Sequence, residues 1–252
     1  YIRPKGDQGA FTQIIDNNDC YNCVYAEKDS VFYAITSKDA DNRRLVRFTR
    51  EDCAPEKWQT LIEEHPTDIL QSVTFKAGKI VALYSNCGQT RVSLYDLNGS
   101  IIRDVPLPPH TSCSFTNGSS GKNTVNLRVS GYTVPDCVMD LDLSTGNLTT
   151  QLQIKAPDPL DDCIVERLYT TSKDGTAVPM TVIRQKRTQL DGTAALKLYG
   201  YGGFYCSLNP SYNAGVAHWV RSGGIFVMAH TRGGLEHGEK WYRDGCLEKK
   251  QN

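Results

Sequence analysis

The sequence has no apolar run long enough to cross a membrane and no excess of charge of either sign. A membrane-spanning helix needs about 20 consecutive apolar residues. The 28 basic residues balance the 28 acidic ones, so no general attraction to nucleic acid or to an anionic membrane surface is expected. No secretory signal is visible, although the sequence begins with Tyr1 rather than methionine. We therefore expect no nucleic acid and no membrane among its partners.

Cysteine is too scarce for a disulfide-stapled scaffold. The nine cysteines are odd in number and irregularly spaced, and they fall well below the roughly 8–10% of such scaffolds. We expect reduced, mostly buried thiols in an intracellular protein. Cys20 and Cys23 form a CxxC, but neither a second pair nor histidines follow at a zinc-site spacing. Ordinary packing is the better interpretation, and no metal site is predicted.

Residues 1–155 have the pattern of short strands joined by turns. Apolar strand-like segments occur in successive pairs, at 31–35 and 44–48, at 79–84 and 91–97, and at 125–129 and 138–143. The second segments end at Phe48, Leu97 and Leu143, a spacing that falls within the roughly 40–50 residues of a β-propeller blade. The pattern predicts a partial β-propeller of about three blades, with an irregular β-sandwich as the alternative.

The pattern changes after 155–159, where two prolines in three residues indicate a linker. Over 156–252, strands are predicted at 164–170, 178–184, 196–199 and 225–229. A helix is predicted at 211–221, with Ser211 as its N-cap and Gly223 ending it. A second helix is predicted at 236–250, weakened at Gly245. Strands that alternate with helices are typical of an α/β sheet.

A glycine-rich bend follows the strand at 196–199, in the segment KLYGYGGF. Glycine lets the chain turn and lets other groups approach the backbone closely. Four segments in order, SKDGTAVPM (172–180), LDGTAALKLYGYGGF (190–204), GGIFVMAHTRGG (223–234) and LEKKQN (247–252), together resemble the prolyl oligopeptidase family of serine peptidases. Residues 1–155 resemble the later blades of that family's propeller.

The resemblance implies a fold and an activity. The fold is the N-terminal part of an α/β-hydrolase domain, preceded by the later blades of a seven-bladed β-propeller. The activity is that of a cytoplasmic serine endopeptidase, monomeric at full length and without a cofactor, which hydrolyses short peptides on the carboxyl side of proline through an acyl-enzyme. An acyl-peptide or dipeptidyl-type relative is a weaker alternative, because those relatives build the bend differently.

Two residues of the bend take roles by the same resemblance. Tyr201 corresponds to the tyrosine that donates its hydroxyl to the oxyanion, and Phe204 to the phenylalanine that helps form the pocket for the proline ring. Both roles suit the side chains, because a tyrosine hydroxyl is protonated at neutral pH and an aromatic face suits an apolar ring. Without the resemblance, core packing beside a tight turn is the simpler interpretation of both.

The rest of a serine hydrolase's machinery is missing from the sequence. The fold requires a G-x-S-x-G elbow, then an acid, then a histidine, and no G-x-S-x-G occurs. We therefore expect a fragment whose nucleophile, acid and base lie beyond Asn252, inactive and poorly soluble by itself. The alternative is a truncated, non-catalytic peptide-binding propeller protein. Leu235 and His237 also depart from the family's usual glycine and tyrosine, which matters if position 235 needs a positive φ.

Overall fold

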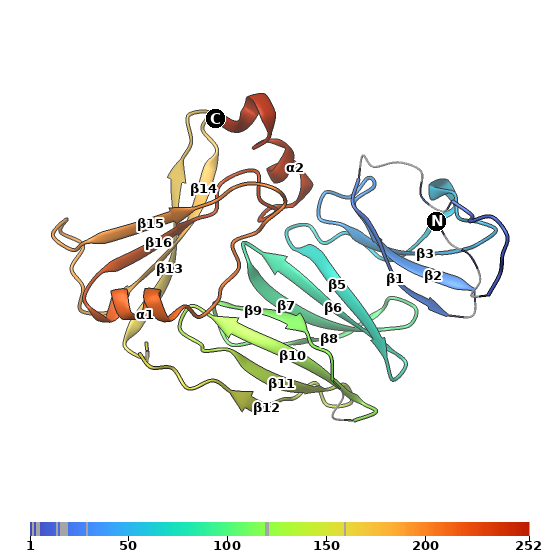
Figure 1. Cartoon of the computed structure of the whole chain (residues 1–252), viewed down its shortest axis with the longest axis horizontal. Helices are drawn as coiled ribbons and strands as arrows, with labels where there is room; N and C mark the ends of the chain where they lie inside the picture. Colours follow the sequence, from blue (N-terminus) through green and yellow to red (C-terminus); the bar gives the residue numbers. More distant parts are fainter. Residues whose placement is uncertain are drawn as a thin grey trace.

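The computed structural model describes residues 1, 3, 6–13, 15, 20–28, 30–118, 121–158 and 160–251. Three four-stranded antiparallel sheets come first, and one mixed four-stranded sheet with a helix follows (Figure 1). The predicted linker lies between the two parts, and its Pro159 falls outside the described residues. Of the helices in the described ranges, none is long and apolar enough to cross a membrane.

Each of the first three sheets is built from four strands that are consecutive in the sequence. The strands are β1 (Asn22–Lys28), β2 (Val31–Thr36), β3 (Arg44–Thr49) and β4 (Gln59–Ile62); β5 (Ile69–Lys76), β6 (Lys79–Asn86), β7 (Gln89–Asp96) and β8 (Ile101–Val105); and β9 (Thr111–Phe115), β10 (Thr124–Gly131), β11 (Cys137–Asp142) and β12 (Leu148–Gln153). A 3-10 turn, η1 (Pro55–Lys57), precedes β4. The predicted strand pairs are the central two strands of each sheet. Separate meanders of this kind agree with propeller blades and not with a sandwich.

Alternation along β6 shows how neighbouring sheets share a core. Val81 and Leu83 pack into a cluster with β10 of the third sheet. Ile80 and Tyr84, on the opposite face, pack into a cluster with the first sheet. Because successive side chains of a strand point to opposite faces, a strand buried on both sides has a continuous apolar sequence. Each side chain buried in this way stabilises the fold by about 1.5–3 kcal/mol.

The last sheet mixes antiparallel and parallel pairs. Its order is β13 (Cys163–Thr171), β14 (Ala177–Gln185), β16 (Ile225–Ala229), β15 (Leu196–Gly200). Strands β15 and β16 are parallel, with Leu198 opposite Val227. A parallel pair needs a crossover, and the helix α1 (Ala214–Arg221) lies on this crossover. Val220 of α1 packs with Phe226 and Ile183 on one face of the sheet.

Both predicted helices are shorter than the sequence indicated. The first begins at Ala214 and is capped by Asn213, whose side chain accepts from the Val216 amide at 3.0 Å, so the prediction of Ser211 as N-cap is wrong. An asparagine is as good a cap as serine, so cap preference alone does not choose between Asn213 and Ser211.

The second predicted helix is divided in two. Helix α2 covers Gly238–Arg243, and a 3-10 turn, η2, covers Leu247–Gln251. The interruption falls at Gly245, where a side chain would overlap the backbone of Arg232 and Gly233. The glycine therefore serves a close approach between two backbone segments, which helical periodicity does not reveal.

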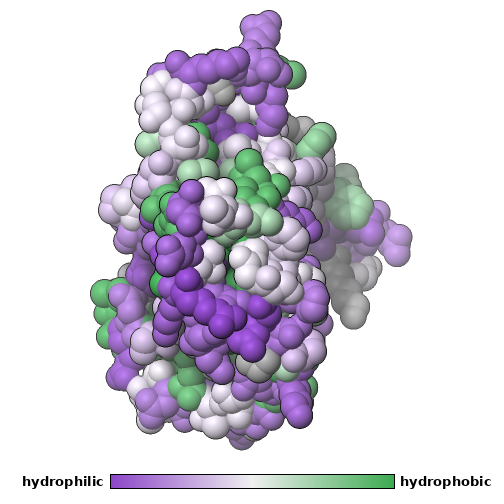
Figure 2. Space-filling model, turned by 90° about the vertical axis from the view of Figure 1, so that its left-hand side faces the viewer, coloured by the Kyte–Doolittle hydropathy of each residue, from purple (hydrophilic) through white to green (hydrophobic). Residues whose placement is uncertain are grey.

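Strand β15 is an edge strand, and all five of its residues are exposed. Leu196, Leu198 and Tyr199 add large apolar groups to the surface. On this side of the molecule, hydrophobic side chains gather among polar ones (Figure 2). An apolar edge strand of this kind offers unpaired backbone groups to a further strand.

The thiols differ from expectation in their burial. Among the nine cysteines only Cys87 and Cys137 are buried, so the expectation of mostly buried thiols is wrong. Cys23 of the CxxC is a free thiol that is partly exposed.

Candidate active site

The bend after β15 is a tight turn with an uncommon backbone conformation. The Cys206 amide donates to the Gly203 carbonyl at 2.9 Å, and the two residues between them, Phe204 and Tyr205, have φ of 53° and 60°. Positive φ at both central residues is the feature of a type I′ turn, where glycine and asparagine are usual. For bulky aromatic residues such a conformation costs about 1–3 kcal/mol each. The surrounding structure must therefore hold this turn.

The glycines of the bend permit a close approach between two backbone segments. Gly202 has φ of 62°, and a Cβ there would overlap the Thr231 hydroxyl and lie 2.7 Å from the Arg232 carbonyl oxygen. Gly233 has φ of 99°, and a Cβ there would overlap the Gly202 carbonyl. Lys250 donates its ammonium group to the carbonyls of both Gly202 and Arg232. The bend is thus packed against the loop that follows β16.

Tyr201 and Phe204, the two predicted site residues, lie together in this bend with their side chains at the surface. Tyr201 is 50% exposed and Phe204 is 83% exposed. Core packing, the simpler interpretation from sequence, therefore does not describe Phe204. The structure leaves both side chains accessible, and their catalytic and substrate-binding roles stay predictions.

Arg232, in the loop that the bend contacts, is held by the turn between β13 and β14. Its Nη1 donates to Asp174 Oδ2 at 2.5 Å and its Nη2 to Asp174 Oδ1 at 3.1 Å. Nη2 also donates to the Ser172 hydroxyl at 3.0 Å. The hydrogen bond from Arg232 holds the pKa of Asp174 well below its usual range. This bidentate pair ties the loop after β16 to the turn between β13 and β14.

Several ionisable groups near the bend are buried, and burial keeps them neutral. His230 bonds the Thr181 hydroxyl at 2.9 Å, and burial lowers its pKa to about 4. His237 lies 3.0 Å from the Cys87 sulfur; burial lowers the pKa of the imidazole and raises that of the thiol to about 11. A neutral thiol is a weak nucleophile. Over the described residues, no three His, Cys, Asp or Glu side chains are arranged to hold a metal ion.

A cavity of about 460 Å³ lies where the loop after the bend crosses the second and third sheets. Its lining is rich in hydroxyl groups and includes Arg128. The hydroxyls come from Ser72, Ser85, Thr90, Ser112, Ser114, Ser130 and Ser211. Neither Tyr201 nor Phe204 lines it, so sequence reasoning missed this polar concavity and had no motif by which to find it.

The family model of the prolyl oligopeptidase N-terminal β-propeller domain matches residues 1–153. The chain belongs to the prolyl oligopeptidase family. It is 30% identical to a prolyl endopeptidase of Elizabethkingia meningoseptica over all of this chain and 36% of the relative. It is 29% identical to prolyl oligopeptidase ophP of Omphalotus olearius over 91% of this chain and 31% of the relative.

Solved structures of prolyl oligopeptidase relatives have the same fold. One, from a structural and mechanistic analysis of two prolyl endopeptidases, has a TM-score of 0.88 and 28% identity, over 94% of this chain and 35% of that one. Prolyl oligopeptidase B from Galerina marginata, bound to a 25mer macrocyclization substrate, has a TM-score of 0.86 and 26% identity, over 95% and 34%. The chain thus spans about a third of the length of these relatives.

Proposed function

We propose that the chain is part of a serine-type endopeptidase that hydrolyses short peptides on the carboxyl side of proline through an acyl-enzyme. Under this proposal residues 1–155 are later blades of a seven-bladed propeller, and 156–252 are the N-terminal part of an α/β-hydrolase domain. The membership of the family supports the activity. The mixed sheet with its exposed parallel edge at β15 supports the second domain, because such sheets are built up strand by strand with helical crossovers.

Tyr201 would donate its hydroxyl to the oxyanion of the tetrahedral intermediate. The observation that carries this assignment is the packing of the adjacent Gly202 against Thr231 and Arg232, which fixes the backbone beside an accessible tyrosine. A donor that is already in position when negative charge develops lowers the barrier by about 3–4 kcal/mol.

Phe204 would form part of the pocket for the proline ring. Its aromatic side chain is 83% exposed on a strained turn, a placement that packing within the described residues does not explain. Strained conformations that the fold maintains are concentrated at ligand-binding sites. A proline ring against its face would bury apolar surface on both groups.

The nucleophile would come from sequence outside these 252 residues, because they contain no G-x-S-x-G. The family resemblance also supports a cytoplasmic, monomeric enzyme without a cofactor. The competing function is a peptide-binding protein without catalysis, which would retain Phe204 and the polar cavity.

The test uses the product of the complete coding sequence and a reporter peptide cleaved after Gly-Pro. We expect hydrolysis, and we expect Tyr201→Phe to lower kcat by about 10²–10³ with little change in KM. Tyr199→Phe, which removes a hydroxyl from the neighbouring strand β15, is the matched control and should retain activity. Equal kcat values for Tyr201→Phe and the unaltered enzyme would refute the oxyanion assignment. Peptide binding without hydrolysis would favour the binding protein.

A further inference from the structure

The turn at residues 203–206 is called the Phe204 turn below. A chain of polar contacts joins it to the first sheet of the propeller. The Tyr205 hydroxyl donates to Glu239 Oε2 of α2 at 2.7 Å. The other carboxylate oxygen of Glu239 accepts from Arg43 Nε at 3.4 Å and Nη2 at 3.3 Å. The side chains of Arg43 and Glu239 are only 5% and 3% exposed. A buried carboxylate needs such partners, and Glu239 has them in Tyr205 and Arg43.

Arg43 is held firmly on the propeller side. It lies in the turn between β2 and β3, and its guanidinium stacks on the Tyr21 ring at 3.7 Å. The side-chain amide of the neighbouring Asn42 donates to the His65 carbonyl at 3.0 Å, and the Asn42 backbone amide donates to Glu64 Oε1 at 2.6 Å.

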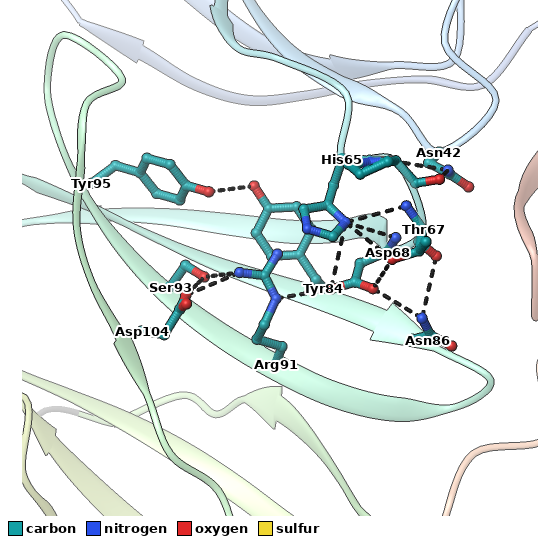
Figure 3. A network of polar contacts seen from close by, with 11 residues as sticks. Asn42, His65, Thr67, Asp68, Tyr84, Asn86, Arg91, Ser93, Tyr95 and Asp104 are labelled. Atoms are coloured by element: carbon teal, nitrogen blue, oxygen red, sulfur yellow. Dashed lines mark hydrogen bonds and ion pairs between the residues drawn. The ribbon is translucent and has the colours of Figure 1, made fainter.

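A polar network connects the same turn to the second sheet (Figure 3). The Asp68 backbone amide donates to His65 Nδ1 at 2.9 Å. The Asp68 carboxylate pairs with Arg91 of β7 at 2.9 Å and accepts from Asn86 at 3.0 Å. Arg91 also pairs with Asp104 of β8 at 3.0 Å. The turn that carries Arg43 is therefore held by contacts with two sheets.

The backbone of helix α2 contacts the turn that carries Arg43. The Glu239 amide donates to the Asp41 carbonyl at 3.0 Å. Gly238 has φ of 82°, and a Cβ there would lie 2.6 Å from the Asn42 side chain. A second, exposed pair joins Arg243 to Asp41 at 2.7 Å. The start of α2 is thus seated on the turn that carries Arg43.

Tyr205 supplies the contacts that hold the strained turn. Phe204 is exposed, so its own side chain contributes little to keeping the positive φ. The Tyr205 ring packs against Tyr242 of α2 with ring centroids 3.7 Å apart and planes tilted by 30°, and its hydroxyl donates to Glu239. A strained conformation persists only where its surroundings determine it. The surroundings here are α2 and, through Glu239, the first sheet.

We propose that Arg43, Glu239 and Tyr205 form a positioning relay, through which docking of the first sheet on α2 holds the Phe204 turn in shape. Separation of the two would remove Arg43 from Glu239 and release Tyr205 and the turn. The relay rests on the proposed function in one respect only, the identity of the ligand that Phe204 binds. None of the three residues is assigned contact with substrate.

Hydrogen–deuterium exchange of the product of the complete coding sequence tests the relay without substrate. Tyr205→Phe keeps the ring and the buried Arg43–Glu239 pair and removes only the hydroxyl. We expect the Cys206 amide, which closes the turn, to exchange about tenfold faster in this variant. Arg243→Ala, which breaks the exposed pair at the same interface, is the matched control and should leave the turn unchanged. Unchanged exchange in Tyr205→Phe would overturn the proposal.

A double-mutant cycle separates a relay from a merely structural interface. Arg43→Ala should also speed exchange of the turn, and Arg43→Lys, which keeps the charge, should restore most of the protection. Adding Tyr205→Phe to Arg43→Ala should produce no further increase, because both changes break one chain of contacts. Additive effects would contradict the relay. If Arg43→Ala does not fold, Tyr205→Phe alone decides. Since activity is not measured, failure of the oxyanion assignment would leave this result standing.

Discussion

Gly202→Ala tests whether the bend depends on a close approach between backbone segments. The substitution adds one methyl group at a residue whose φ is 62°. That methyl group would overlap the Thr231 hydroxyl and lie 2.7 Å from the Arg232 carbonyl oxygen. The backbone carbonyl cannot move without shifting the loop after β16, which Asp174 holds through its bidentate pair with Arg232.

Two terms contribute to the expected destabilisation. An alanine in the left-handed region costs about 1–2 kcal/mol, and insertion of a methyl group into a packed site costs about 1–3 kcal/mol more. The control is Gly175→Ala, in the turn between β13 and β14. Gly175 has φ of 83°, but a Cβ there would meet nothing within 4 Å. Only the backbone term applies to it, so the variants should differ by about 1–3 kcal/mol.

Urea unfolding of both variants and the unaltered chain measures this difference. The free energy of unfolding in water comes from linear extrapolation, and an unchanged slope confirms that the same surface is exposed. A destabilisation of about 2–5 kcal/mol for Gly202→Ala is expected, the sum of the two terms. If Gly202→Ala and Gly175→Ala are destabilised equally, the loop around Thr231 accommodates a side chain freely and the reasoning from close approach is wrong.

Two further predictions concern pH. Because buried His230 has a pKa of about 4 and an unfolded histidine about 6.5, the unfolded chain binds the extra proton between these values, and stability should fall as pH drops through this window. Between pH 4 and 6.5, the free energy of unfolding of His230→Gln should change less with pH than that of the unaltered protein, by up to about 3 kcal/mol. Parallel curves of unfolding free energy against pH for the two proteins would contradict this. Asp174, whose pKa is lowered chiefly by its hydrogen bond from Arg232, stabilises the fold above its unfolded pKa and loses that contribution as pH falls. Asp174→Asn should therefore be less stable at pH 7, with a gap that narrows in acid below about pH 4 when both are compared by thermal melting.

Local pattern was sufficient for the two central strands of each of the first three sheets. The segment around Ile80 and Tyr84 is apolar at every position because the strand is buried on both faces, and such a run is visible in sequence. The helix ends were less predictable. Asn213 and Ser211 are equivalent caps in sequence, and the interruption at Gly245 depends on Arg232, which is close only in the folded chain.

The site divides in the same way. The glycine bend was found from a local motif, because its residues are consecutive. The contact between Arg43 and Glu239 joins positions separated by 196 residues, and neither residue lies in a motif. Tyr205 had no distinguishing signal, since the turn's positive φ comes from tertiary contacts and not from glycine or asparagine.

Leu235 and His237, which differ from the glycine and tyrosine that the family resemblance implies, both fit the structure around the bend. Leu235 does not adopt a positive φ, and its side chain is buried, so an L-residue fits there. His237 places its ring 3.0 Å from the sulfur of Cys87, a residue of the turn between β6 and β7. His237 therefore connects the second sheet to the start of α2.

The steric demand of this region thus falls on particular glycines and not on every position of the motif. Gly202 and Gly233 each have positive φ and each would clash with the other segment's backbone if they carried a side chain. Position 235 meets neither condition. A change from glycine to leucine can accordingly be accepted at 235, whereas the much smaller change from glycine to alanine at 202 cannot. Conformation and neighbouring backbone atoms, rather than the size of the substitution, decide which glycines of the motif are required.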